Sequence, residues 1–359
     1  MRSSHYSTIV ATGRAIPTRQ VPNSDFLGHE FFGENQKRLP QSNEHIVKKF
    51  ETITGIAERR HVTDDLVASD LALQAAQDAL NSSQIDKETL DYVIVAHNFG
   101  DVTAASRRTD LVPSLAARVK HRLQIDNPRT VAYDLPFGCP GWLQGMIQAD
   151  YYLRSGDAKR ALVIGAETLS RVSDPHDRDS MIYADGAGAT ILEAVESDRP
   201  IGILSHRTRS DTREHAFLLW MGRSNHPSAG QDLVLKMNGH RLYEYALKTV
   251  PSLIIECLAR SGVALKDISK VLIHQANEKM DEAIVERVFK LSGETEVPPD
   301  IMPMTISWLG NSSVATLPTL LDLILKGDLA GHRLGSGANV VFASVGAGMN
   351  INAVVYRFA

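Results

Sequence analysis

The 359-residue sequence has only two cysteines, no long apolar run and no marked excess of charge of one sign. Its 38 Lys and Arg residues against 42 Asp and Glu residues give a formal net charge of -4, which excludes the broad basic surface typical of nucleic-acid-binding proteins. Apolar stretches such as residues 161–166 are far shorter than a membrane span, and residues 1–7 lack the apolar segment of a secretory signal. We therefore expect a cytoplasmic protein with free thiols and no membrane span.

Helical and strand-like patterns alternate along the chain, which is typical of the α/β fold class. A helical pattern at 69–80 precedes a strand pattern at 92–97, and another around 253–258 precedes a strand pattern at 271–274. Three positions recur in the two segments at nearly the same spacing: Leu80, Ile85 and His97, then Leu258, Val263 and His274. This recurrence indicates an internal duplication.

Later parts of the two segments also correspond. Each has a further strand pattern, then a Gly-rich turn that leads into a last strand: 160–165 with 186–188, and 339–344 with 346–348. We therefore expect two α/β halves, 1–198 and 199–359, joined at the polar stretch 197–200. Residues 33–43 and 211–231 fall outside this rhythm, and loops of that length usually cover a site or an interface.

Cys139 is the candidate nucleophile. It lies between a strand pattern and an amphipathic helical pattern, in the sequence Phe-Gly-Cys-Pro-Gly-Trp. Pro140 suits the first position of a helix, which would place the thiol at a helix N-terminus. The partial positive charge there favours the thiolate, and free backbone N–H groups can bind an oxyanion. The alternative is a small buried core residue, which is our interpretation of Cys257 on the apolar face of its helix.

Two residues are candidate partners of the thiol. His274 ends an apolar strand pattern, and the carboxyl ends of parallel strands are where α/β folds place their sites. Asn311 lies in a turn before a helical pattern at 315–325, where it could instead be a helix N-cap. The loop 346–348 could be a tight turn only, or it could aim backbone N–H groups at the sulfur. Neither it nor 186–188 opens a helix, as a dinucleotide-binding motif must, and no metal-ligand spacing occurs.

Together these features resemble the β-ketoacyl-acyl carrier protein synthase III group of the thiolase-like condensing enzymes, over nearly the whole chain. The resemblance implies a five-layered α/β fold of two duplicated halves, usually a homodimer. It also implies acyl thioesters of coenzyme A or an acyl carrier protein as substrates, and no cofactor. The motifs that carry it are Thr54-Gly55-Ile56, Ser69-Asp70-Leu71-Ala72, Gly138-Cys139, Asp174-Pro175, Asp185-Gly186-Ala187-Gly188-Ala189, His274-Gln275-Ala276-Asn277 and Gly310-Asn311-Ser312-Ser313.

The resemblance also assigns roles to individual residues. Cys139 would carry the acyl group, while His274 and Asn311 would hold the thioester carbonyl of a malonyl-type partner during its decarboxylation. The backbone N–H groups of Cys139 and Ala347 would form an oxyanion hole. Residues expected to contact substrate are Arg178, Gly239, His240, Tyr243, Ala276 and Asn277 along the pantetheine tunnel, with Phe137 and Trp142 beside the nucleophile.

Several departures from the family pattern bear on the substrate. His240 stands where Asn is usual, Tyr243 where Phe is usual, and bulky residues flank Cys139. No aromatic adenine clamp is evident near 43–56, and the stretch 97–113 is long. These departures favour a specialised member that takes longer or carrier-bound acyl chains. One such member would join a β-ketoacyl thioester to a second acyl chain, as in dialkylresorcinol or aryl pigment pathways.

Other functions remain as alternatives. An acyltransferase on the same fold would pass the acyl group to an alcohol or amine. A cysteine protease also runs Cys, His and Asn along the chain, but its local cysteine signature is missing. A scaffold protein with a dead site would have lost one of the three residues. An acidic carrier protein would need a basic landing surface, for which the candidates are Lys48, Lys49, Arg107, Arg108, Lys236 and Arg241, although each could be an ordinary solvated charge.

Overall fold

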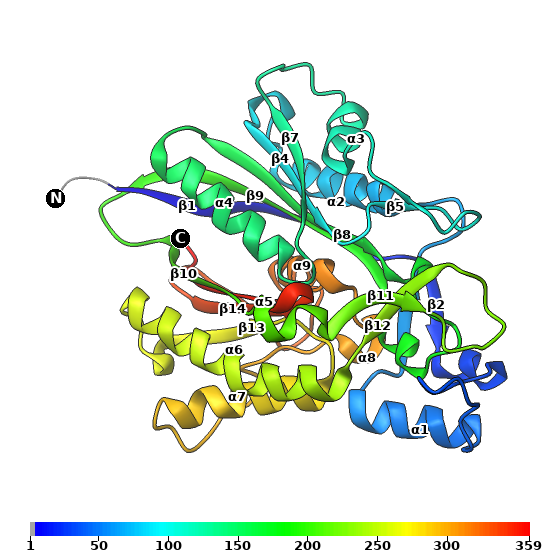
Figure 1. The fold of residues 1–359 in the computed structure, drawn as a ribbon. Helices are drawn as coiled ribbons and strands as arrows, with labels where there is room; N and C mark the ends of the chain where they lie inside the picture. The colour runs from blue at the N-terminus through cyan, green and yellow to red at the C-terminus, as the bar shows by residue number, and fades with distance from the viewer. Residues whose placement is uncertain (1–3) are drawn as a thin grey trace.

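The computed structural model describes residues 4–359, which form two large sheets between layers of helices, with three further sheets of two strands each (Figure 1). The larger sheet has the order β1-β9-β8-β4-β7, and the smaller has the order β10-β15-β14-β13. The strands of the first are β1 (Ser4–Ala15), β9 (Asp185–Ser197), β8 (Arg160–Thr168), β4 (Tyr92–His97) and β7 (Val131–Pro136). The strands of the second are β10 (Gly202–Ser210), β15 (Asn350–Arg357), β14 (Asn339–Gly346) and β13 (Ile268–Ile273).

The two sheets repeat one pattern of strand directions. In the first, β1 and β9 are antiparallel, β9 and β8 are antiparallel, and β8 and β4 are parallel. The second repeats this with β10, β15, β14 and β13 in the corresponding places. The expected seam at 198 and 199 falls in the link between β9 and β10.

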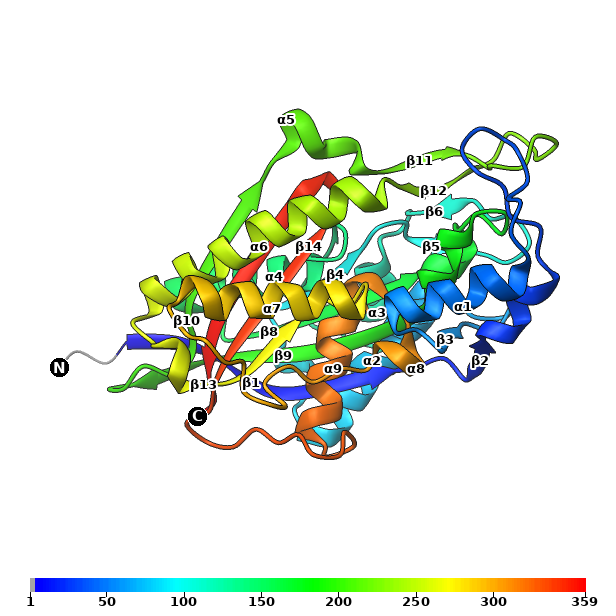
Figure 2. The same ribbon diagram turned by 90° about the horizontal axis from the view of Figure 1, so that it is seen from below.

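Helices separate the sheets and cover their outer faces, which gives five layers. The middle layer consists of α4 (Gly141–Ser155) and α9 (Thr316–Leu325). The outer layers are α2 (Ala68–Ser83) with α3 (Leu115–Arg122), and α6 (Gly239–Ser261) with α7 (Glu278–Leu291). Figure 2 shows α6 and α7 side by side across the second sheet. The buried core between the sheets includes Trp142, Phe342 and Tyr356. The predicted α/β fold class, with five layers built from two similar halves, is therefore confirmed.

The segment 186–188 is not the expected turn. Its glycines lie inside β9, where Gly188 pairs with both β1 and β8 and Gly186 pairs with β8. A Cβ atom on Gly188 would lie 2.7 Å from the Cβ of Pro318, so glycine here lets α9 pack directly on the strand. The equivalent segment 346–348 does turn the chain, between β14 and β15.

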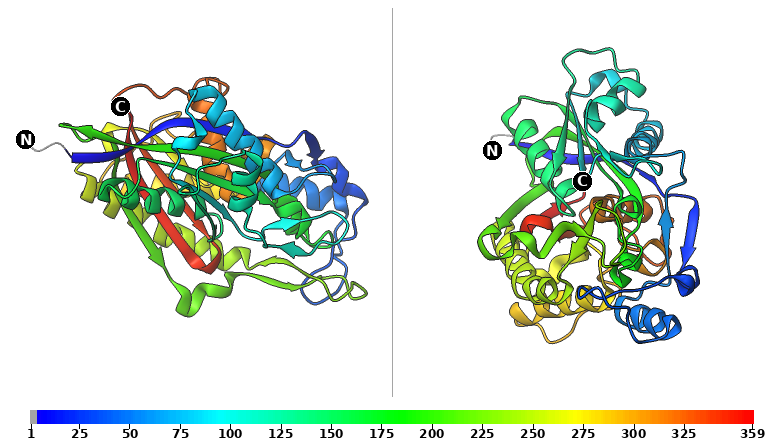
Figure 3. Two further views of the ribbon diagram at one scale, coloured as in Figure 1. Left: turned by 90° about the horizontal axis from the view of Figure 1, so that it is seen from above. Right: turned by 45° about the vertical axis from the view of Figure 1, so that its right-hand side comes forward.

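Two segments outside the duplicated pattern contain regular structure. Residues 211–231, expected to be a loop, include α5 (Thr212–His215) and β11 (Leu219–Arg223), which pairs with β12 (Leu233–Met237). The hairpin β11–β12 extends toward the end of the molecule opposite the start of β1 and the C-terminus (Figure 3). Next to the expected loop 33–43 lies α1 (Asn43–Thr54), which contacts α7. Smaller elements are β2 (Arg19–Pro22), β3 (Glu58–His61), β5 (Asp101–Val102), β6 (Thr109–Asp110) and α8 (Ile306–Leu309).

In the part of the chain that the structure describes, no helix is long and apolar enough to cross a membrane.

Candidate active site

Cys139 lies in the turn between β7 and α4, as the sequence predicted. Gly138 has a φ of 75°, a left-handed conformation that glycine adopts without strain, and it turns the chain back toward the helix. Pro140 precedes α4 as its N-cap, one position earlier than expected, and α4 begins at Gly141. The thiol is half-buried beside the N-terminus of α4, whereas Cys257 is fully buried in the core.

The surroundings of Cys139 oppose ionisation more than the sequence suggested. Burial raises the pKa of the Cys139 thiol to about 11, and the Glu167 carboxylate acts in the same direction. The Ser313 hydroxyl acts against both, because it donates a hydrogen bond to Sγ over 3.3 Å. The sulfur therefore depends on hydrogen-bond donors to become a nucleophile.

His274 follows directly after β13, at the strand end where the sequence placed it. Its backbone N–H donates to the carbonyl of Ala343 (2.9 Å) on β14, which fixes the residue to the sheet. Burial lowers the pKa of the imidazole to about 4, so the ring is neutral near pH 7. Its Nδ1 is buried and has no partner among the described residues. A neutral ring in this state can donate one hydrogen bond without carrying charge.

Asn311 is oriented by its own loop. Its Oδ1 accepts a hydrogen bond from the backbone N–H of Ser313 (2.8 Å), so Nδ2 is left as the group that can donate to a ligand. Ser313 adopts a φ of 54°, which is unusual for a residue other than glycine and is typical of constrained functional loops. Asn311 is therefore not a simple N-cap: α9 begins five residues later, at Thr316.

The loop 346–348 lies against Cys139. A Cβ on Gly346 would lie 2.8 Å from the backbone N of Cys139, and one on Gly138 would lie 3.2 Å from the backbone N of Ala347. Glycine at both positions allows the two backbones to meet. The geometry brings the two N–H groups expected to form an oxyanion hole into one small region.

A cavity of about 230 Å³ contains Cys139, His274 and Asn311 in its wall together with Ala347. The rest of its lining is mainly apolar, from the hairpin β11–β12 and neighbouring elements: Phe99, Leu169, Leu219, Trp220, Met221, Leu235, Met237, Leu242, Met280 and Val345. The three predicted catalytic side chains thus converge from both halves of the chain. Such a site can hold an apolar acyl chain beside a thiol.

A second cavity of about 480 Å³ adjoins the first. Both share Asn311, Ala276, Met237, Leu242 and Met280 in their walls. All six residues expected along the pantetheine tunnel line it: Arg178, Gly239, His240, Tyr243, Ala276 and Asn277. One face of α1 forms its remaining wall through Ile46, Lys49, Phe50 and Ile53. The sequence did not predict this helix, although Ser42 caps its N-terminus and Gly55 ends it.

Two residues expected beside the nucleophile do not line either cavity. Trp142 is 1% exposed and packs edge-on against Phe342 in the core between the sheets, because α4 turns it away from the thiol. Phe137 is half-buried on the other side of the turn and is not among the lining residues.

Lys236 was wrongly expected on a basic surface. Its Nζ is buried, and it pairs with Asp174 (2.5 Å) and Asp177 (3.1 Å). Along β12 side chains alternate, so Leu235 and Met237 face the first cavity while Lys236 points to the carboxylates. This ion pair fastens the hairpin that covers the apolar cavity. Lys48, Lys49, Arg107, Arg108 and Arg241 are exposed, as expected.

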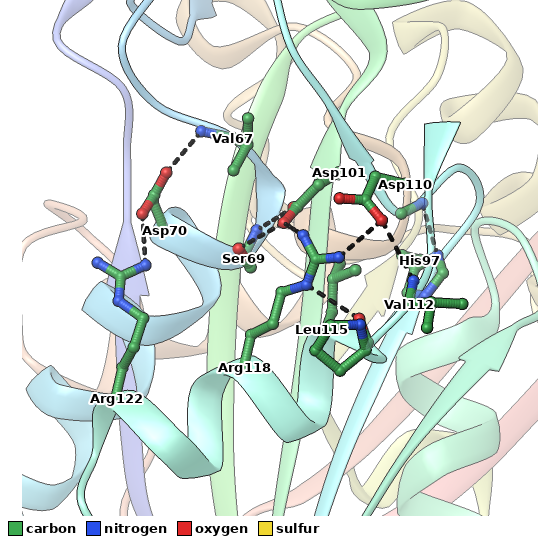
Figure 4. A network of polar contacts seen from close by, with 12 residues as sticks. Val67, Ser69, Asp70, His97, Asp101, Asp110, Val112, Leu115, Arg118 and Arg122 are labelled. Atoms are coloured by element: carbon green, nitrogen blue, oxygen red, sulfur yellow. Dashed lines mark hydrogen bonds and ion pairs between the residues drawn. The ribbon is translucent and has the colours of Figure 1, made fainter. Parts of the chain in front are cut away.

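The long segment after β4 is held by polar contacts (Figure 4). Asp101 accepts hydrogen bonds from the backbone N–H and hydroxyl of Ser69 (both 2.7 Å), and Arg118 bridges Asp101 and Asp110. These contacts tie the segment to the N-terminus of α2 and to α3. The segment starts with Asn98 and Phe99, which line the first cavity. The network therefore fixes one wall of the site.

Sequence reasoning missed several residues close to the thiol. Asn98, Glu167 and Ser313 form a chain of hydrogen bonds that ends on Cys139 Sγ, and Tyr183 lines the same cavity. Asn98 follows the end of a parallel strand, a position that could have marked it. Among the described residues, no group of three or more His, Cys, Asp or Glu residues is placed to hold a metal ion.

The sequence matches two family models. Residues 133–212 match the 3-oxoacyl-[acyl-carrier-protein] synthase III model, and residues 258–358 match the model of its C-terminal part. The two segments make up about half of the chain and contain all three candidate catalytic residues.

Solved structures show the same similarity over the full length. β-Ketoacyl-[acyl carrier protein] synthase III from Thermus thermophilus is 29% identical, with 98% of this chain and 99% of that chain covered and a TM-score of 0.80. The synthase III of Pseudomonas aeruginosa PAO1 is 25% identical, with 98% of each chain covered and a TM-score of 0.80. The priming β-ketosynthase of the R1128 polyketide pathway is also 25% identical, with 100% and 98% covered and a TM-score of 0.81.

Proposed function

The chain belongs to the 3-oxoacyl-[acyl-carrier-protein] synthase III family of condensing enzymes, and on that premise we propose that it joins two acyl thioesters through an acyl-Cys139 intermediate. One observation carries the proposal: Cys139, His274 and Asn311 share the wall of an apolar cavity that adjoins a second, more polar one. A thiol, two neutral hydrogen-bonding groups and room for an acyl chain are what a thioester condensation needs.

The first step is transfer of the acyl group to sulfur. The Cys139 thiolate attacks the carbonyl carbon of the donor thioester, and the donor leaves as a thiol that takes up the proton lost by Cys139. The backbone N–H groups of Cys139 and Ala347 would stabilise the negative oxygen of the tetrahedral intermediate, because the two loops meet at Gly138 and Gly346. The acyl chain then occupies the apolar cavity under β11–β12.

The second step forms the carbon–carbon bond. A malonyl-type thioester enters by the second cavity, and its thioester oxygen binds to His274 and to Nδ2 of Asn311. Its carboxylate leaves as carbon dioxide, and the electron pair of the broken bond becomes an enolate held by these two donors. The enolate carbon attacks the acyl-Cys139 carbonyl, and Cys139 leaves as a thiolate. A His274 ring that is neutral near pH 7 suits this role, since it donates a hydrogen bond without itself releasing a proton.

The second cavity suits the carrier arm of the substrate. Arg178 and Lys49 line it, and cations of this kind bind phosphate groups, while the ring of His240 adds a hydrogen-bonding group. We therefore propose coenzyme A or acyl carrier protein thioesters as substrates, with the exposed Lys48 and Arg241 as part of a landing surface for an acidic carrier. We also propose a homodimer, since β7 lies at the edge of its sheet and, among the described strands, pairs only with β4.

A donor panel tests the proposal. The enzyme is incubated with acetyl, octanoyl and 3-oxo-octanoyl thioesters plus a malonyl thioester, and carbon dioxide and products are measured. We expect β-ketoacyl products with equimolar carbon dioxide, and loss of condensation but not of acyl loading in His274→Ala and Asn311→Ala. Turnover of 3-oxoacyl donors alone would identify the specialised synthase. Transfer to an alcohol or amine without carbon dioxide release would identify an acyltransferase and overturn the proposal.

A further inference from the structure

A chain of four side chains leads from the protein interior to the sulfur of Cys139. Glu167 on β8 is completely buried, and its Oε2 accepts from both the backbone N–H of Asn98 (2.9 Å) and the Asn98 amide. The Asn98 amide also donates to the hydroxyl oxygen of Ser313 (3.0 Å). The Ser313 hydroxyl in turn donates to Cys139 Sγ (3.3 Å). The four residues come from different parts of the chain, so only the fold brings them together.

The direction of every bond in this chain is determined by chemistry. Oε2 of Glu167 already accepts the backbone N–H of Asn98 and is therefore an acceptor oxygen of the carboxyl group, so the Asn98 side-chain atom that faces it must be the Nδ2 donor. Nδ2 carries two hydrogens and accepts none, so its second hydrogen must point to Ser313. A hydroxyl has a single hydrogen, and once its oxygen accepts from Asn98 that hydrogen is free to point at the sulfur.

We propose that Glu167 and Asn98 are positioning residues that make the Ser313 hydroxyl an obligatory hydrogen-bond donor to the Cys139 thiolate. We call the chain Glu167–Asn98–Ser313 a polarity relay, because each hydrogen bond in it fixes the direction of the next. This inference rests on Cys139 being the nucleophile of the proposed reaction. Its effect is to stabilise the thiolate in a buried site that otherwise favours the thiol. A donor hydrogen bond to an ionised group is among the stronger ones in proteins.

The relay also explains a costly feature of the site. Oε1 of Glu167 is buried and has no partner among the described residues. Burial raises the pKa of this carboxyl to about 7, and its charge disfavours the nearby thiolate. A buried carboxylate this close to Cys139 would only disfavour the thiolate, unless its hydrogen bonds to Asn98 stabilise the thiolate by more than its charge destabilises it.

Substitutions that preserve shape but reverse the relay test it. In Asn98→Asp the new carboxylate can only accept, so the Ser313 hydrogen turns toward that carboxylate and the sulfur loses its donor. Ser313→Ala removes the donor outright. Glu167→Gln keeps an acceptor oxygen for Asn98 but removes the charge, so it should ease ionisation. Asn98→Asp also adds a negative charge near the sulfur, so Ser313→Ala, which changes no charge, is the variant that isolates the loss of the donor.

The measurement is the pH profile of Cys139 alkylation by iodoacetamide in the free enzyme, followed by intact mass. The other titratable side chains in the wall of the same cavity, His274 and Tyr183, are unchanged across the series. Cys139→Ala corrects for any reaction at the buried Cys257. Ser312→Ala is the matched control, because its hydroxyl bonds to Thr316 and not to sulfur.

We expect Asn98→Asp and Ser313→Ala to react about tenfold more slowly at neutral pH, with profiles displaced to higher pH. Glu167→Gln should be displaced to lower pH, and Ser312→Ala should match the wild type. A wild-type profile in Ser313→Ala, or a displacement of Glu167→Gln to higher pH, would overturn the relay. Because no acyl donor is used, the outcome is independent of whether the enzyme condenses thioesters.

Discussion

The contact between the loop 346–348 and Cys139 allows a sharp prediction. A methyl group at Gly346 would lie 2.6 Å from Cδ of Pro140, 2.8 Å from the backbone N of Cys139 and 3.0 Å from its Cβ. Ordinary contacts of a Cβ atom begin at 3.4 Å, so Gly346→Ala must push the two loops apart by somewhat less than 1 Å. The φ of Gly346 is -165°, which any residue adopts, so the effect is steric and not a matter of backbone strain.

This displacement separates the two proposed oxyanion donors from the sulfur. Misplacement of a reacting group by about 1 Å costs on the order of 100-fold in rate, and overpacking costs about 1–3 kcal/mol in stability. We therefore expect Gly346→Ala to load acyl groups on Cys139 about 100-fold more slowly while it remains folded. The assay is single-turnover acyl transfer followed by mass spectrometry, with thermal unfolding in parallel.

Gly335→Ala is the matched control, because nothing lies within 4 Å of its added methyl group and its backbone needs no positive φ. It should load acyl groups at the wild-type rate. Wild-type loading by Gly346→Ala would refute the placement of the loop against the nucleophile.

Three further predictions follow from the site. The unfolded chain takes up a proton on His274 near pH 6.5, whereas the native chain does so only near pH 4. The free energy of unfolding should therefore fall by up to about 3 kcal/mol as the pH drops between these values. In denaturant titrations over that range, His274→Gln should lose less stability than the wild type. Lys236→Met leaves the buried carboxylate of Asp174 and the partly buried one of Asp177 without their cation and should cost about 3–5 kcal/mol of unfolding free energy. The exposed Lys48→Met should cost almost nothing, and equal unfolding midpoints for the two variants would contradict the buried ion pair. Leu235→Trp should fill the apolar cavity and lower the rate of octanoyl loading relative to acetyl loading about tenfold. Leu233 is exposed on the same strand, so Leu233→Trp should leave the ratio of the two loading rates unchanged.

The positions that sequence predicted well are those set by local patterns. Cys139, His274 and Asn311 each lie where a strand or turn ends, and parallel strands bring such ends to one edge. The structure places all three in one cavity, while their catalytic roles remain predictions. The six residues expected along a pantetheine tunnel likewise line one cavity, because they lie in the same motifs or at the start of one helix.

What the sequence could not predict depends on long-range packing. Asn98 and Ser313 are 215 positions apart, and only the junction of the two sheets brings the amide to the hydroxyl. The burial of Lys236 requires two carboxylates from a distant turn, and nothing near it in sequence indicates them. Gly188 serves the packing of a helix against a strand, and its sequence cannot be distinguished from a turn without the partner helix.

The central claim is that Cys139 carries the acyl group, and intact mass measurement after incubation with an acyl thioester tests it most directly. We predict one added acyl mass per chain, mapped by peptide analysis to the peptide that contains Cys139 and absent from Cys139→Ala at unchanged thermal stability. Acyl loading that persists in folded Cys139→Ala, or that maps to Cys257, would contradict the account.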